Sequence, residues 1–181
     1  MFRPRDRAAL LATLICVAVA PTAQSQTEAD RQKAVAEIEK SGGKVGRDEA
    51  VPDKPVVAVN FGVTQVADAG LEPLKAFPKL KSVILNNTKV TDAGLDQLKP
   101  LAGLEKLYLV DTAITDAGLE RLKGLTKLRV LSLVGTKVTD AGLDHLKGMA
   151  DLREVFLAAT KVTDAGVKRL KEALPKATVV R

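Results

Sequence analysis

The chain has 181 residues and a formal net charge of +6, with 46% hydrophobic and 28% charged residues but only 3% aromatic residues. This apolar share is sufficient for a packed core of aliphatic side chains in one domain. One cysteine and one histidine exclude a disulfide framework, a cysteine-based zinc site and a multi-histidine metal centre. Most familiar catalytic constellations are therefore excluded before any motif is considered.

Residues 1–25 have the three parts of a secretory signal peptide. Three arginines form a basic start, a run of 13 apolar or near-apolar residues follows, and a segment of small residues ends it. Thirteen such residues are too few for a membrane anchor, which needs about 20. We expect cleavage after Ser25, with cleavage after Ala23 or an uncleaved N-terminal anchor as the alternatives. A lipoprotein through Cys16 is disfavoured because the bulky Ile15 precedes it.

Cleavage of the signal peptide would change the net charge and the cysteine content of the chain. Removing residues 1–25 takes away three Arg and one Asp, which lowers the net charge to +4. It also removes the only cysteine, so the mature chain can form no disulfide even in an oxidising compartment. We expect a periplasmic, cell-surface or secreted protein with no stable membrane insertion after cleavage.

Residues 26–55 are predicted to form an N-terminal cap. Residues 27–40 have the pattern of an amphipathic helix with Ala34, Val35 and Ile38 available for packing, and residues 44–47 are expected to form a short strand before a proline-containing linker. Terminal units of a repeat array need a polar outer face. This segment is therefore expected to cover the first repeat.

From residue 56 onward the chain is an array of 24-residue units. The clearest marker is the pentapeptide Thr-Asp-Ala-Gly-Leu, which occurs in three unchanged copies and two variants. Their Asp residues are Asp68, Asp92, Asp116, Asp140 and Asp164. A constant interval across five copies is not produced by chance, so the segment 56–181 consists of similar structural units.

Each unit also contains the pattern Leu-x-x-Leu-x-Leu-x-x-Thr, as in residues 104–112. Its alternating leucines predict a strand with one buried face, and residues 115–125 show the helical spacing of apolar residues that follows. A strand and a helix within one such unit make one coil of a solenoid. This is the leucine-rich repeat pattern, with Thr where many such repeats have Asn or Cys.

The units resemble the cysteine-containing, helix-bearing subtype of leucine-rich repeats found in F-box substrate receptors of ubiquitin ligases. They are more similar to short secreted bacterial leucine-rich repeat proteins with Thr-x-Val-Thr-Asp-Ala-Gly-Leu units. The resemblance, over residues 56–181, implies an α/β solenoid of about five repeats and a terminal strand. Parallel strands would line the concave face of a horseshoe segment and helices the convex face, after an N-terminal capping helix. The absence of an F-box and the export signal disfavour a ubiquitin-ligase role.

The repeated residues are assigned to the core and to the helix ends. Stacked leucines are expected to form one continuous core, each contributing roughly 1.5–3 kcal/mol. Thr91 and its equivalents are predicted N-caps, and the Asp after each favours the positive end of the helix. The glycine of each Asp-Ala-Gly costs about 1 kcal/mol relative to alanine in a helix, which implies a close approach to the strand layer or the neighbouring coil. A second set of repeated threonines is expected to form hydrogen bonds with backbone groups where the strands turn: Thr64, Thr88, Thr112, Thr136 and Thr160.

Two charged columns have functional alternatives. The Asp column could bind calcium, but no second carboxylate recurs beside each Asp, and Ca²⁺ takes six to eight oxygens. The lysine column could bind phosphate or an acidic surface, but no aromatic residues interleave with it. A solvated convex face is the favoured interpretation for these lysines: Lys75, Lys99, Lys123, Lys147 and Lys171.

No residue pattern supports an enzyme. His145 occupies the same repeat position as Gln97 and Arg121, which are polar residues expected at the surface, and no Ser or Cys partner accompanies it. A nucleophile–base pair and a metal-ligand cluster are both absent from the sequence. We therefore expect no catalytic residue, no cofactor and no bound metal.

Function is expected on the concave face, where the residues between the repeated leucines vary. The only Tyr and one of four Phe fall there, and large aromatic side chains are enriched at binding hot spots. The alternative is that a short, weakly curved sheet tolerates scattered apolar residues. The predicted protein-binding residues are Ile84, Lys106, Tyr108, Val110, Val130, Ser132, Glu154 and Phe156.

The sequence thus predicts an exported, non-enzymatic module that binds a protein partner and no nucleic acid. The alternative is a structural or assembly element of the cell envelope that uses its C-terminal edge or its lysine-rich convex face. Residues 175–181 match the strand pattern and no capping helix follows them, so an exposed edge strand is expected. A weak homodimer through that strand is a further hypothesis.

Overall fold

The computed structural model describes the backbone of residues 23–181 and the side chains of residues 27–181. The predicted signal peptide therefore lies almost entirely outside the described residues. The first helix, α1 (Ala23–Lys40), begins four residues before the predicted start at residue 27. The cleavage point expected after Ser25 falls in the first turn of this helix.

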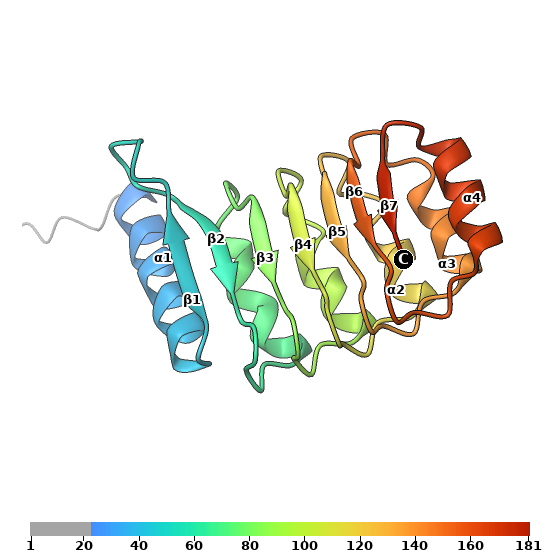
Figure 1. Ribbon diagram of the computed structural model, residues 1–181. Helices are drawn as coiled ribbons and strands as arrows, with labels where there is room; N and C mark the ends of the chain where they lie inside the picture. Colours follow the sequence, from blue (N-terminus) through green and yellow to red (C-terminus); the bar gives the residue numbers. More distant parts are fainter. Residues whose placement is uncertain (1–22) are drawn as a thin grey trace, which may run out of the picture.

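One sheet of seven strands forms a face of the molecule, with the strands in sequence order (Figure 1). The first two strands are antiparallel, and every later neighbour is parallel. The parallel register advances by one repeat unit, so that Leu107 pairs with Leu131. The strands are β1 (Lys44–Arg47), β2 (Val56–Asn60), β3 (Ser82–Ile84), β4 (Lys106–Tyr108), β5 (Val130–Ser132), β6 (Glu154–Phe156) and β7 (Thr178–Val180).

Short helices lie behind the sheet, as expected for the convex side of a leucine-rich repeat solenoid (Figure 1). Several are 3₁₀ rather than α-helical, which the sequence pattern does not distinguish. Pro73 lies inside the first of them and has no backbone N–H to contribute to a helical ladder. The elements are η1 (Asp68–Ala76), η2 (Asp92–Leu98), α2 (Asp116–Arg121), α3 (Asp140–Leu143), η3 (Asp144–Leu146) and α4 (Asp164–Ala173).

The core runs continuously through the coils, and α1 closes its N-terminal end. Ala34 and Ile38 of α1 are buried and Val35 is partly buried, as the amphipathic pattern predicts. The central residues of the strands, such as Leu107 and Leu131, are buried as well. The repeated leucines that are expected to stack from coil to coil are all buried: Leu74, Leu80, Leu85, Leu98, Leu104, Leu109, Leu122, Leu128, Leu133, Leu146, Leu152, Leu157 and Leu170.

The predicted Thr roles are largely confirmed. The Thr136 hydroxyl donates to the Leu133 carbonyl at 2.6 Å, and Thr88, Thr112 and Thr160 make the equivalent bond. Thr64 differs, because its hydroxyl oxygen accepts from a backbone N–H instead. The predicted N-caps Thr91, Thr115, Thr139 and Thr163 each accept a backbone N–H of their own helix at 3.3 Å. These bonds satisfy backbone groups at both ends of the strand-to-helix connection.

Four of the five repeated Asp residues also bond the next coil, a role that the helix-start interpretation does not include. The carboxylate of Asp116 accepts the Thr139 N–H through Oδ1 and the Thr139 hydroxyl through Oδ2, both at 2.7 Å. We call this pair of bonds the Asp–Thr clamp. The same clamp joins Asp68 to Thr91, Asp92 to Thr115 and Asp140 to Thr163. The Asp column is thus a series of links between coils.

The clamp explains four of the five repeated glycines. A Cβ atom added to Gly142 would lie 2.3 Å from Oδ1 of Asp116 in the preceding coil. Gly94, Gly118 and Gly166 face the preceding Asp in the same way, at 2.2–2.4 Å. The close approach expected from the sequence is therefore to the neighbouring coil, and the group that requires it is the Asp carboxylate.

Candidate functional site

The strand register gathers the predicted binding residues into two rows on the concave face. Ser82, Lys106, Val130 and Glu154 form one row, and Ile84, Tyr108, Ser132 and Phe156 form the next. The residues between the rows are buried, so side-chain alternation turns both rows away from the core. Val110 follows Tyr108 by two residues, and its N–H donates to the Asn86 amide oxygen at 3.0 Å.

These side chains differ in how much surface they offer. Lys106 and Glu154 are exposed, whereas Ile84, Tyr108, Val110, Val130 and Phe156 are partly buried. Ser132 lies in register between Tyr108 and Phe156 and is only 5% exposed. Its neighbours in the row therefore supply the accessible surface.

Val180 of β7 extends the second row, although it is not among the binding residues predicted from the sequence. It pairs in register with Phe156 and is 46% exposed, which makes it one of the few exposed large apolar side chains among the described residues. The sequence signal was available, because Val180 occupies the same position in the terminal strand as Phe156 does in the unit before it. The second row thus carries Ile84, Tyr108, Phe156 and Val180 around the buried Ser132.

The two margins of this face differ in chemistry. At the start of the strands, Lys81, Lys106 and Arg129 are exposed and form no ion pair within the described part of the chain. At the other margin, the residue that follows each of the strands β2 to β6 by three has a positive φ; Val63 is the β-branched example, with φ 61° and 83% exposure. The N–H groups of Val63, Asn87, Asp111 and Gly135 donate to the next coil, as from Asn87 to the Val110 carbonyl at 2.8 Å. The sheet ladder therefore continues beyond the short strands and holds this margin in place.

On the convex face, three of the repeated lysines form ion pairs with acidic residues of their own coils. Lys99 pairs with Asp96 at 2.6 Å, Lys147 with Asp144 at 2.7 Å and Lys123 with Glu120 at 3.5 Å. The hydrogen bond from Lys99 and the charge of Arg121 hold the pKa of Asp96 below its ordinary value. Local pairing of this kind agrees with a solvated convex face. His145 lies partly exposed on η3 of this side.

The described residues contain no helix long and apolar enough to cross a bilayer. They also contain no cluster of three or more His, Cys, Asp or Glu side chains arranged to hold a metal ion. The carboxylates of the calcium alternative have identified partners, since four of them form Asp–Thr clamps.

A family model described as a leucine rich repeat matches residues 124–146, which is about the length of one coil. No curated protein matches the sequence. Among solved structures, the leucine-rich repeat ectodomain of the receptor kinase SOBIR1 from Arabidopsis thaliana is similar, with 16% identity and a TM-score of 0.55. That similarity covers 84% of this chain and 91% of the ectodomain.

Two bacterial structures are also similar. Internalin C2 from Listeria monocytogenes has 23% identity and a TM-score of 0.51, over 67% of this chain and 50% of the internalin. A leucine-rich repeat protein from Leptospira interrogans has 20% identity and a TM-score of 0.49, over 60% of this chain and 27% of that protein. The chain thus spans half of the internalin and about a quarter of the Leptospira protein. The internal repeats, the matched unit and the shared architecture show that the chain folds as a leucine-rich repeat solenoid.

Proposed function

We propose that this protein is an exported, non-enzymatic module that binds a protein partner on the concave face of its sheet. The observation that carries the proposal is the row formed by Ile84, Tyr108, Phe156 and Val180. The parallel register aligns these large apolar side chains on a face that no other described element covers. Aromatic and large apolar groups on a rigid surface are the usual anchors of protein interfaces.

The dimensions of the row indicate the kind of segment that would bind. From Ile84 to Val180 the row crosses five strands, which at about 4.8 Å per step is roughly 19 Å. That length suits one helix or one extended segment of the partner laid across the strands. Because the row residues sit on hydrogen-bonded strands, ordering them on binding would cost little entropy.

Export is supported by the signal-peptide pattern of residues 1–25. The similarity to a receptor ectodomain and an internalin agrees with this part of the proposal. The repeats also fit the cysteine-containing, helix-bearing subtype of the family, with Thr at the polar position. In three coils that Thr is buried and donates to a backbone carbonyl: Thr88, Thr112 and Thr136.

The alternative is an assembly element of the cell envelope that binds through its convex lysines or its C-terminal edge strand. The ion pairs of Lys99, Lys123 and Lys147 with acidic residues of their own coils disfavour the convex face. The observation in favour of the edge is that β7 pairs only with β6 in the described sheet. Sedimentation of the full chain at tens of micromolar tests the edge-strand homodimer, and a monomer there would contradict it.

The main test compares truncation of concave-face side chains with truncation of an exposed apolar side chain elsewhere. The double variant Tyr108→Ala/Phe156→Ala is expected to weaken partner capture at least about 30-fold, since even one hot-spot side chain contributes about 2 kcal/mol or more. The matched control is Val51→Ala, which removes an exposed apolar side chain from the loop before β2. Circular dichroism of each variant checks that the fold is retained.

Site-specific photo-crosslinking locates the bound partner independently. A photoreactive residue at Val130, on the concave face, is expected to crosslink the partner, whereas the same residue at Lys123 on the convex face is not. Unchanged capture by the double variant, or crosslinking only from position 123, would overturn the concave-face proposal.

A further inference from the structure

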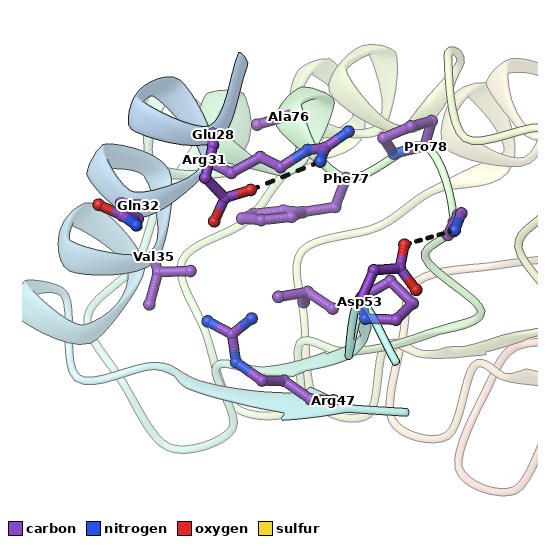
Figure 2. A pocket seen from close by; sticks show the side chains of 12 residues that line it. Glu28, Arg31, Gln32, Val35, Arg47, Asp53, Ala76, Phe77 and Pro78 are labelled. Carbon is purple, nitrogen blue, oxygen red and sulfur yellow. Dashed lines mark hydrogen bonds and ion pairs between the residues drawn. The ribbon is translucent and has the colours of Figure 1, made fainter. Parts of the chain in front are cut away.

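A small cavity lies where α1 meets the first coil, away from the concave rows (Figure 2). Its volume is about 90 Å³, and its walls come from α1, from the region between β1 and β2, and from the turn after η1. Phe77 and Val56 in its lining are 3% and 5% exposed. Figure 2 shows the Phe77 ring between Val35 of α1 and Asp53 of the β1–β2 loop. Part of the lining is thus apolar and buried.

Charged groups surround the mouth of the cavity, and positive charge is in excess. Glu28 pairs with Arg31 at 3.6 Å, and Asp53 pairs with Lys79 at 3.0 Å. The hydrogen bond from Lys79, together with the charges of Lys79 and Arg31, holds the pKa of Asp53 below its ordinary value. Asp53 is therefore a stable carboxylate that already has its cations.

Arg47 is the cation in the lining that has no carboxylate partner within the described chain. Its guanidinium donates only to the Lys54 carbonyl, at 3.3 Å. Figure 2 shows this guanidinium turned toward the space bordered by Val35 and Phe77. A guanidinium has five N–H donors and matches a carboxylate through two parallel hydrogen bonds. Arg47 can therefore accept one further anion beside an apolar space.

The volume limits the apolar part of the ligand. An apolar cavity of about 150 Å³ holds a benzene ring, so 90 Å³ suits a smaller branched aliphatic group. We propose that this cavity binds a branched aliphatic carboxylate, with its alkyl group against Phe77 and Val35 and its carboxylate on Arg47. Two sources share this chemistry: a free short-chain carboxylic acid, and the C-terminal residue of a peptide that ends in Leu or Val.

A ligand at this place contacts the cap and the repeats together. The walls of the cavity belong to separate segments of the chain, so the ligand binds only the folded protein. Binding therefore raises the unfolding temperature of the protein by linkage. The cavity and its ligand do not involve Tyr108 or Phe156. The proposal for the cavity is therefore tested independently of concave-face binding.

Titration of the ¹⁵N-labelled full chain with isovalerate, followed by NMR, tests the proposal. We expect saturable shifts confined to α1, to residues 44–56 and to residues 76–79, with a Kd on the order of millimolar for so small a ligand. Isovaleramide, the neutral isostere, is expected to bind about tenfold more weakly because it cannot form the charged pair. A tripeptide ending in Leu and its C-terminal amide distinguish the two sources: tighter binding of the free-acid peptide than of isovalerate identifies a peptide C-terminus, and binding of isovalerate alone identifies a free acid.

Four variants complete the test. Arg47→Gln is expected to weaken isovalerate binding about tenfold, whereas Arg129→Gln, at an exposed arginine on the strand margin, leaves it unchanged. Ala76→Leu fills the cavity and is expected to abolish binding while the protein stays folded. The absence of saturable shifts, equal binding of acid and amide, or an unaffected Arg47→Gln variant would each overturn the proposal. Tyr108→Ala/Phe156→Ala is expected to bind isovalerate normally, which separates this result from any failure of the concave-face test.

Discussion

Replacement of Gly142 by alanine is expected to destabilise the protein, although helices usually favour alanine over glycine. Gly142 lies inside α3 and is buried. An added Cβ would lie 2.3 Å from Oδ1 of Asp116 and 3.1 Å from a methyl carbon of Leu119. Because a Cβ does not approach an oxygen so closely, the carboxylate must move away from Thr139.

The size of the effect follows from the bonds that are lost. The Asp–Thr clamp at this position consists of two hydrogen bonds of 2.7 Å to a partly buried carboxylate. With about 1 kcal/mol for each bond at this exposure, and up to about 1 kcal/mol gained from helix propensity, a net loss of about 1–2 kcal/mol remains once steric strain is included. For a chain of this length that lowers the Tm by roughly 2–8 °C.

Thermal and urea unfolding of four proteins form the assay: wild type, Gly142→Ala, Asp116→Ala and the double variant. Once Asp116 is alanine the obstacle is gone, so the added Gly142→Ala substitution is expected to be neutral or stabilising by up to about 1 kcal/mol. Gly148→Ala is the matched control, since a Cβ there meets nothing within 4 Å. It is expected to leave stability unchanged or to raise it slightly.

Two results would refute the reasoning. If Gly142→Ala is as stable as the wild type, the Asp116 carboxylate does not occupy the space beside Gly142 in solution. If the substitution destabilises equally with and without Asp116, the loss arises from another contact of α3, and the clamp does not explain the constant spacing of Asp and Gly within this chain.

Further predictions concern stability and its pH dependence. Thr136→Val removes a buried hydroxyl that donates to a backbone carbonyl at 2.6 Å, so unfolding in urea is expected to show a loss of about 1 kcal/mol; Thr178→Val, at an exposed position, is the control and is expected to be neutral. Hydrogen bonds from Thr163, assisted by the charge of Arg169, hold the pKa of Asp140 below its ordinary value of 3.8. The stabilisation is therefore complete above pH 3.8 and is lost as the pH falls through the lower pKa of the folded state. Asp140→Asn is expected to lessen this loss in thermal unfolding measured on both sides of that pH, and an unchanged pH profile would contradict the assignment.

The features of the fold that recur in every repeat unit were predictable. Leu104, Thr112 and Thr115 each do what their neighbours in the adjacent coils do, so one correct assignment applies to the whole column. The partner of Asp116 was not predictable from its own coil. Local helix rules consider contacts three or four residues apart, whereas the clamp joins residues 23 apart. The same rules do not separate 3₁₀ from α geometry in helices as short as α3 and η3.

The candidate site was predictable in its position and less so in its accessibility. Alternation along the strands places Tyr108 and Phe156 on the outer face, and the parallel register confirms that they share a row. The burial of Ser132 depends on the larger side chains on either side of it, which single-strand patterns do not include. The cavity at α1 was missed because Arg47 and Phe77 belong to different elements, which only the folded chain brings together.

The Asp–Thr clamp has a consequence for how an array of this kind can change in length. Every clamp is a translation of the one before, from a residue to the residue 23 positions later, and its glycine lies 26 positions after the Asp. Duplication or loss of one complete coil therefore preserves all of these contacts, while an insertion of any other length separates a carboxylate from its Thr and Gly. Gain of one coil between Tyr108 and Phe156 would move them further apart by one strand spacing of about 4.8 Å, and loss of the coil between them would bring them nearer by the same amount. The binding row can thus be lengthened in fixed steps without redesign of the convex side.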